Sequence, residues 1–505
     1  RAGEQLNFTS QVELSKRFGY IDKKGMRAVE TFMQLYFLHA KNVGDLTRIF
    51  LTSLETKHVK KKPTIAVQLR YLMGTNFGFG KEFLPKEFSL IHGRLNIVDS
   101  KEFLKKPDNL LRLFQVSLKS KSLIHPEALR LVAGNLHLVD ENFRNSPQNN
   151  ENFLDLLLNY DNPEKALRHM NEVGFLGAFI PEFGRIVAMM QFNMYHSYTV
   201  DEHTIQCIHN LSEIEHGKLH EDLPIASEIL EGDVNRRILY VALLLHDIGK
   251  GLPQDHSKIG AKIATKLSPR LGLKSEECET IEWLIENHLL MSDVAQKRDI
   301  TDNRTIQNFA KQVTSAARLK LLTVLTVCDI RGVGPNSWNN WKAVLLRELY
   351  KQTLSTLNEG SMTHSRPEKV NEAKNKIKEK LINWDKVDVK TELDRHYDSY
   401  WLGLDVDTQI IFANLLFGIK DQILKLKIDT DTSRDANSVC CVMEDHPGIF
   451  ARLSGALALI GANVVDARTY TTRDGFATAV FWIQEQNGLP FEESRLTKLE
   501  QLIKK

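Results

Sequence analysis

The feature that most constrains the fold of this chain is an apolar periodicity of three and four residues along most of its length. The pattern is clear over residues 26–54, 109–119 and 126–138, and it dominates again over residues 152–357. Apolar residues at this spacing form one face of an amphipathic helix. Glycine and proline, which interrupt helices, are sparse in the first third of the sequence. The sequence therefore predicts a mainly α-helical protein.

The character of the sequence changes near its end. The pattern there predicts a strand, a helix, two strands around the turn Arg473-Asp474-Gly475 and a second helix, over residues 438–443, 447–460, 464–472, 477–483 and 496–503. This order in fewer than about 70 residues is typical of a small ferredoxin-like α+β domain.

A chain of 505 residues is too long for one ordinary domain. We expect a helical region, a helical domain that carries the chemistry, a connecting region and the α+β domain, at residues 1–150, 151–357, 358–435 and 436–505. Two stretches are polar: residues 145–151 predict a loop or a joint between helices, and residues 429–437 predict a short linker. The lysine-rich residues 359–394 predict an exposed helix.

Charge and cysteine content exclude several classes of protein. Lysine and arginine total 66 against 64 acidic residues, a net charge of +2, so charge does not favour nucleic-acid or membrane binding. The basic residues 58–62 lack interleaved aromatic residues and predict a solvated loop. No apolar run approaches the roughly 18 residues that span a bilayer. Five cysteines without C-x-x-C spacing indicate a reducing cytoplasm, with no disulfide framework and no thiolate zinc site.

The strongest chemical signal is the pair His246-Asp247, which follows an apolar run and precedes Gly249, a residue that predicts the end of the helix. Adjacent helical residues point about 100° apart, so one metal ion can bind both only with ligands from other helices. His203 and Asp329, on predicted neighbouring helices, are the candidates. Imidazole and carboxylate ligands favour a divalent ion such as Mn, Fe, Co or Zn, or Mg where oxygen ligands dominate.

His256 and His288 lie between these residues and suggest a second ion. If both bind metal, the site holds two ions and Asp247 bridges them; otherwise they cap helices or hydrogen-bond the substrate. A metal ion polarises a phosphoryl oxygen and lowers the pKa of bound water, as phosphoester hydrolysis requires. Lys250 could stabilise phosphate charge, as could Lys297 or Arg298. Asp247, Lys250, His256 and His288 are therefore the predicted catalytic residues.

The order His, His-Asp, His, His, Asp resembles the HD phosphohydrolase superfamily. The surrounding sequence is similar to the family of bifunctional PII uridylyltransferase/uridylyl-removing enzymes (GlnD), over residues 183–187, 198–204, 245–251, 255–257, 288–292, 295–299, 338–342 and 346–350. The resemblance implies a cytoplasmic, helical HD-type core that removes UMP from a tyrosine of the PII nitrogen-signalling protein. It also implies that glutamine stimulates this hydrolysis.

Residues 445–452 and 461–467 resemble an ACT domain, which often binds an amino acid. Pro447 and Gly448 open a helix whose free N–H groups can hold a carboxylate, and Asn463 or Asp466 on the facing strand could meet an α-amino group. The predicted effector site is Asp445, Pro447, Gly448, Ile449, Asn463 and Asp466. The alternative is a packing domain without a ligand.

The sequence departs from the family in two respects. The nucleotidyltransferase domain of the family carries a Gly-Ser turn followed by Asp-x-Asp, and this combination does not occur in the sequence. The family also has two ACT domains, whereas this sequence contains about one. We therefore expect the hydrolase core and the first ACT domain. The rival interpretations are a non-catalytic scaffold and an HD hydrolase of a free nucleotide.

Overall fold

The computed structural model divides the chain into two compact units. The N-terminal unit comprises Arg1–Met291 and Ala317–Ser337, and the C-terminal unit comprises Ser292–Ala316 and Trp338–Lys505. The residues that the structure describes are 6–58, 84–192, 198–232, 234–300, 302–335, 337–358, 366–419, 423–431, 434, 436–485 and 488–503. The predicted basic loop at residues 58–62 lies almost entirely outside these residues.

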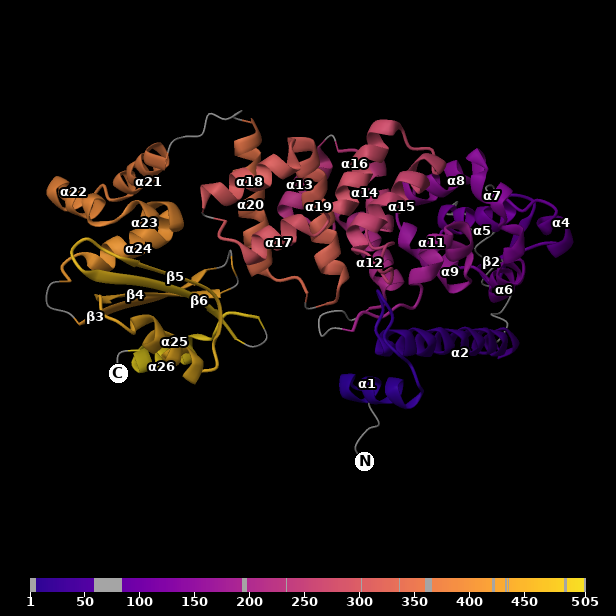
Figure 1. Ribbon diagram of the computed structural model, residues 1–505, viewed down its shortest axis with the longest axis horizontal. Helices are drawn as coiled ribbons and strands as arrows, with labels where there is room; N and C mark the ends of the chain where they lie inside the picture. Colours follow the sequence, from indigo (N-terminus) through magenta and orange to yellow (C-terminus); the bar gives the residue numbers. More distant parts are fainter. Residues whose placement is uncertain are drawn as a thin grey trace, which may run out of the picture. The chain divides into compact units, whose positions relative to one another are not determined.

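The first part of the N-terminal unit is helical, as predicted (Figure 1). Its helices are α1 (Phe8–Arg17), α2 (Ala28–His58), α4 (Ser100–Leu104), α5 (Asn109–Lys119), α6 (Pro126–Gly134), the 3₁₀ turn Leu136–Leu138, α7 (Glu141–Asn145), α8 (Pro147–Leu158), α9 (Pro163–Glu172), α10 (Phe175–Phe179) and α11 (Pro181–Ile186).

One feature of this part was not predicted. Strands β1 (Phe88–Ile91) and β2 (Arg94–Ile97) form an antiparallel hairpin. Its two turn residues, His92 and Gly93, both have positive φ, as a tight hairpin turn requires, and this two-residue turn was the signal in the sequence. Of the two predictions for residues 145–151, the joint between helices is confirmed and the loop is not. Ser146 lies between α7 and α8 and caps α8 by accepting a hydrogen bond from the Asn149 N–H, and Pro147 occupies the first helical position, where proline is favoured.

The second part of the N-terminal unit contains the residues predicted to bind metal. Its helices are α12 (Val200–Glu215), α13 (Pro224–Glu231), α14 (Arg236–Leu245), α15 (His256–Arg270), α16 (Ser275–Glu286) and α19 (Ala316–Gly332). Helix α14 is central: every residue from Ile238 to Leu245 is buried, and the helix contacts α8, α12, α15 and α16. Burial on all sides explains why its sequence is almost entirely apolar.

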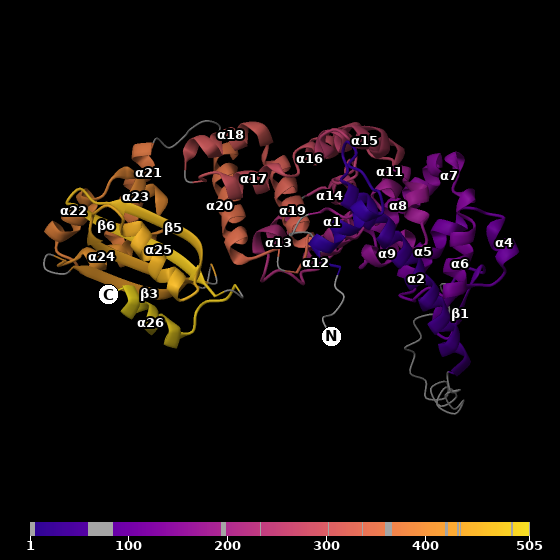
Figure 2. The same ribbon diagram turned by 60° about the horizontal axis from the view of Figure 1, so that its bottom comes forward.

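The C-terminal unit contains a four-stranded antiparallel sheet in the order β3-β4-β6-β5, formed by β3 (Leu424–Asp431), β4 (Ala436–Glu444), β5 (Asn463–Thr471) and β6 (Phe476–Gln484). One face packs against α21 (Arg366–Lys380), α22 (Lys386–Arg395), α23 (Asp398–Gly403) and α24 (Val406–Leu416). The other face packs against α25 (Ile449–Leu459) and α26 (Glu493–Ile503), and Figure 2 brings α25 in front of the sheet. The unit also contains α18 (Asn303–Val313), α20 (Asn340–Asn358) and, from Ser292 onward, α17 (Leu290–Lys297).

The predicted ferredoxin-like order is confirmed from β4 to α26, but the predicted linker at residues 429–437 is wrong. Strand β3 runs to Asp431 and pairs with β4, which begins at Ala436, so residues 429–431 and 436–437 of this stretch belong to two paired antiparallel strands. Lys425 and Lys427 alternate with Leu424, Leu426 and Ile428, a strand signal in the stretch assigned to the connecting region. None of the described helices is both long and apolar enough to span a membrane.

Candidate metal centre

Three helices bring the four principal predicted ligands together. His203 lies on α12, His246 and Asp247 follow the end of α14, and Asp329 lies on α19; these helices are neighbours in the structure (Figure 1). His203 Nε2 is 3.2 Å from His246 Nε2 and 3.1 Å from Asp329 Oδ1. Asp247 Oδ2 is 3.3 Å from His246 Nε2 and 3.5 Å from His203 Nε2. The donors therefore surround one point.

These separations fit a metal ion. An ion about 2.1 Å from each ligand places neighbouring ligand atoms roughly 3.0–3.5 Å apart. The tautomer of His246 also fits, because its Nδ1–H donates to the Leu243 carbonyl oxygen at 2.8 Å and leaves the Nε2 lone pair for the ion. A backbone acceptor that orients a ligand histidine is typical of metal sites.

A second group of donors adjoins the first. Asp247 Oδ1 is 3.9 Å from both His256 Nε2 and His288 Nε2. This oxygen is buried and makes no hydrogen bond, which is costly for a carboxylate unless a cation binds it. His288 Nδ1–H donates to the Ile285 carbonyl oxygen at 2.7 Å, so its Nε2 is available as a ligand. The geometry therefore suits a second ion, with Asp247 between the two.

The electrostatics of the cluster favour cation binding. Burial would raise the pKa of Asp247, but Lys250 and His246 hold it well below its usual range, so the carboxylate stays ionised. Burial lowers the pKa of His288 to about 4 and also lowers that of His256, so both imidazoles are neutral at pH 7. Burial also acts on His246, but Asp247 and Asp329 raise its pKa to about 10. In the metal-free protein His246 is therefore protonated at neutral pH.

Two glycines make the cluster sterically possible. A Cβ atom on Gly249 would lie 2.2 Å from the His256 carbonyl oxygen, so only glycine lets this turn approach the start of α15. A Cβ atom on Gly332 would lie 2.4 Å from Cys207 Sγ and 3.1 Å from His203 Nδ1. From the sequence, Gly249 was predicted only as the end of a helix, because the spacing of residues does not show how closely a turn approaches the next helix. Gly332 was not predicted at all, because its contact with Cys207 and His203 joins segments more than 120 residues apart and leaves no local signal.

Cys207 is a neighbour of the cluster that the sequence did not suggest. Its Sγ lies 3.6 Å from His203 Nε2. Burial raises the pKa of this thiol well above its usual value, and the thiolate is the form that binds metal. The histidines and carboxylates therefore remain the preferred ligands.

Lys250 lies within the cluster, as predicted, with its Nζ 2.6 Å from Asp247 Oδ2. Lys297 and Arg298 belong to the C-terminal unit instead. Lys297 is exposed there and forms an ion pair with Asp293 at 2.6 Å.

The predicted effector residues divide between two faces of the C-terminal sheet. Gly448, with φ of +92°, immediately precedes α25. Ile449 is the first residue of that helix, and its side chain is buried in the core between the helix and the sheet. Asp445 accepts a hydrogen bond from Thr471 Oγ1 at 2.8 Å, Pro447 follows it in the same exposed turn, and Asn463 is exposed at the start of β5.

Asp466, by contrast, pairs with Trp482 across the sheet and lies on the face opposite α25. It forms ion pairs there with Arg468 at 3.3 Å and Arg434 at 3.7 Å. The alternation of β5, shifted by an irregularity between Val464 and Asp466, sets this direction. The structure thus does not bring Asp466 to the start of α25, and the effector site remains a prediction.

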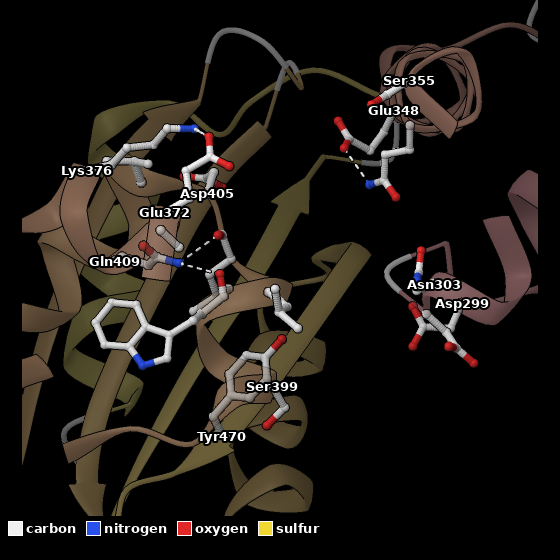
Figure 3. Close-up of a pocket in the computed structure, with 17 residues that line it drawn as sticks. Asp299, Asn303, Glu348, Ser355, Glu372, Lys376, Ser399, Asp405, Gln409 and Tyr470 are labelled. Carbon is white, nitrogen blue, oxygen red and sulfur yellow. Dashed lines mark hydrogen bonds and ion pairs between the residues drawn. The ribbon is translucent and has the colours of Figure 1, made fainter. Parts of the chain in front are cut away.

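A cleft of about 950 Å³ within the C-terminal unit contains none of the predicted site residues (Figure 3). Gln409 at its edge donates to the carbonyl oxygens of Trp401 and Leu404, and Glu372 pairs with Lys376 at 2.7 Å. Five carboxylates line it: Asp299, Asp302, Glu348, Glu372 and Asp405. The cleft is therefore acidic, unlike a phosphate-binding site.

Comparison with known proteins agrees with this geometry. Three family models match the chain: the GlnD PII-uridylyltransferase model over residues 1–51, the uridylyltransferase GlnD third domain over residues 88–179, and the HD domain over residues 200–328. The HD match contains His203, His246 and Asp247 and ends one residue before Asp329.

Relatives named bifunctional uridylyltransferase/uridylyl-removing enzyme match the entire chain. Those of Cereibacter sphaeroides, Ruegeria pomeroyi and Azospirillum brasilense are 56%, 54% and 42% identical to it. The chain spans about half the length of these relatives: 53%, 55% and 54%. A solved structure of a CCA-adding enzyme matches 66% of the chain and 64% of its own, at 14% identity and a TM-score of 0.31, which is too low to support an argument. From the family matches and the full-chain identity to its relatives, this chain belongs to the GlnD family.

Proposed function

We propose that this chain carries a metal-dependent phosphodiesterase that removes UMP from a uridylylated tyrosine of the PII signal protein. The observation that carries the proposal is the convergence of His203, His246, Asp247 and Asp329, whose ligand atoms lie 3.1–3.7 Å apart. The name of the relatives, which includes a uridylyl-removing activity, supports the choice of substrate.

The chemistry follows from the groups in the cluster. When bound, a divalent ion polarises the phosphoryl oxygens and lowers the pKa of water to near neutrality. Lys250, whose side chain is 13% exposed, can donate to a phosphoryl oxygen and stabilise its charge. His256, whose side chain is 30% exposed and neutral at pH 7, either completes a second metal site or accepts a proton from the attacking water.

Hydrolysis breaks the bond between phosphorus and the tyrosyl oxygen. Because the tyrosyl hydroxyl has an ordinary pKa of about 10, this oxygen is a fairly good leaving group. The chain therefore needs a strong nucleophile and charge stabilisation more than a strong acid. These are the two tasks that the metal ligands and Lys250 support.

The experiment combines elemental analysis with an assay on uridylylated PII. We expect the purified chain to contain one or two equivalents of a divalent metal and to release UMP. Chelation should abolish that release, and a divalent ion should restore it. Unchanged release of UMP in a metal-free preparation would refute the proposal.

Two other functions are separated by the same assay. A non-catalytic scaffold would bind PII without releasing UMP, and the complete set of ligands argues against it. A hydrolase of free nucleotides would act on UTP or UDP faster than on uridylylated PII, and the match of the entire chain to uridylyl-removing relatives argues against this alternative.

We further propose that the ferredoxin-like region is an ACT domain through which glutamine stimulates the hydrolysis. The turn before α25 offers the expected carboxylate site, with Gly448 at the helix start. Calorimetric titration of the chain with glutamine, with glutamate as the control, tests this proposal. The proposal would be contradicted if glutamine neither bound to the chain nor stimulated the release of UMP.

A further inference from the structure

A small pocket of about 320 Å³ adjoins the metal centre within the N-terminal unit. Lys250 and His256 line one side of it, so the pocket is continuous with the catalytic groups. The turn from Gly251 to Asp255 and the residues Met189, Met190 and Gln191 form further walls. The last wall comes from far away in the sequence: Gly25, Met26 and Glu30, which lie more than 200 residues before Lys250.

The N-terminal wall is tightly fixed. Gly25 packs so closely on the turn after the His-Asp pair that a Cβ atom would lie 2.5 Å from the Leu252 carbonyl oxygen. Glu30 accepts hydrogen bonds from the backbone N–H of Phe192 at 3.2 Å and of Arg27 at 2.8 Å. Gln34 donates to the carbonyl oxygens of Val187 and Arg185. Residues 25–34 therefore contact both the turn from Gly251 to Asp255 and the segment 185–192, which form the other walls of the pocket.

We propose that this pocket holds the nucleoside of the nucleotidyl group while its phosphate lies at Lys250, and that residues 25–34 are positioning residues for it. The proposal rests on the proposed function. Met26, Met189 and Leu252 provide an apolar surface for a flat base. Gln191 and Gln254 each offer one carboxamide donor group and one acceptor, as the imide edge of uracil requires.

The size of the pocket favours the nucleotide over the protein part of the substrate. A volume of about 320 Å³ lies at the lower end of the range of small-ligand sites, roughly 300–1,000 Å³. A nucleoside fits such a space, whereas a folded protein loop does not. PII would then contact the rim and leave only the nucleotide inside.

The test uses the metal-loaded chain and bis(4-nitrophenyl) phosphate, a phosphodiester without a nucleoside. UMP should inhibit its hydrolysis competitively, and calorimetry should give the UMP and CMP dissociation constants. Gln254→Ala, at an exposed position that does not endanger the fold, should weaken UMP binding about two- to tenfold, the worth of one hydrogen bond. It should also reduce the preference for UMP over CMP, which a merely structural change would not alter.

Gly25→Ala tests the N-terminal wall, and Gly19→Ala is its matched control. Both glycines have positive φ, +89° and +76°, but no atom lies within 4 Å of a Cβ on Gly19. We expect Gly25→Ala to weaken UMP binding at least about tenfold with unchanged metal content, and Gly19→Ala to change neither.

The possible results separate this proposal from the proposed function. If the chain hydrolyses uridylylated PII but UMP does not bind, or if Gln254→Ala binds UMP and CMP as the parent does, the pocket assignment is overturned. If Gly25→Ala and Gly19→Ala behave alike, the role of residues 25–34 is overturned. If the chain hydrolyses neither uridylylated PII nor bis(4-nitrophenyl) phosphate, the proposed function itself fails.

Discussion

Replacing Asp247 by asparagine removes one negative charge from the point where both groups of donors meet. Oδ2 lies within 3.5 Å of His203 Nε2 and His246 Nε2, and Oδ1 lies 3.9 Å from the Nε2 atoms of His256 and His288. Asparagine keeps the size of the side chain but places an N–H₂ group where one lone-pair-bearing oxygen was. One substitution therefore weakens every metal position that the cluster offers.

The expected magnitude follows from this geometry. Mutation of residues that only support a metal ligand typically costs about 10- to 100-fold in metal affinity or activity. Asp247 is a direct ligand in our assignment and serves both groups, so UMP release should fall at least about a hundredfold, or by about 2.7 kcal/mol in activation free energy. The fold should survive, because His246 can release its proton when its partner is lost.

The assay compares metal content, UMP release and thermal unfolding for Asp247→Asn and for a matched control, Asp201→Asn. Asp201 is also buried and lies two residues before His203, but it accepts hydrogen bonds from the Ala188 N–H and from Asn171 Nδ2. The control keeps both interactions, because Asn171 can turn its amide and accept with Oδ1, which makes no hydrogen bond. Normal metal content and UMP release in Asp247→Asn would refute the assignment.

Three further outcomes are expected. Lys250→Gln should keep its metal but lose about a hundredfold in UMP release, as measured by steady-state kinetics, and a loss confined to metal binding would contradict this role. Gly249→Ala should lower the free energy of unfolding in urea by roughly 1–3 kcal/mol, whereas Gly134→Ala, with no atom within 4 Å of its Cβ, should not lower it. Equal effects of the two substitutions would refute the claim that close packing requires glycine at position 249. Because His246 has a pKa of about 10 in the metal-free protein, a metal ion must displace its proton, so metal affinity should rise with pH below that value. Calorimetry in two buffers should detect the released proton, and binding without proton release would contradict the protonated state of His246.

The sequence by itself determined the helical class, the principal candidate ligands and the order of elements after residue 436. Helical periodicity is local, so the predicted helix over residues 109–119 coincides with α5. His203, His246, Asp247 and Asp329 could be selected together because their order along the chain matches a known pattern, and the structure brings His246, Asp247 and Asp329 within 3.5 Å of His203 Nε2. The distances between these side chains could not be derived from periodicity. Periodicity indicates which face of a helix is buried, but it does not indicate which other helix packs against that face.

Only the tertiary structure decided which groups surround the cluster. Gly332 matters because a Cβ atom there would collide with Cys207, which lies 125 residues earlier in the chain, and Gly25 contacts the turn at Leu252 across more than 200 residues. Gly249 lies only seven residues before His256, but it is needed because the tertiary fold brings the turn after α14 against the start of α15. Asp466 points away from α25 because one irregularity in β5 fixes which face its side chain takes. Such features depend on close packing and on strand pairing in the assembled fold, which the local spacing of residue types does not report.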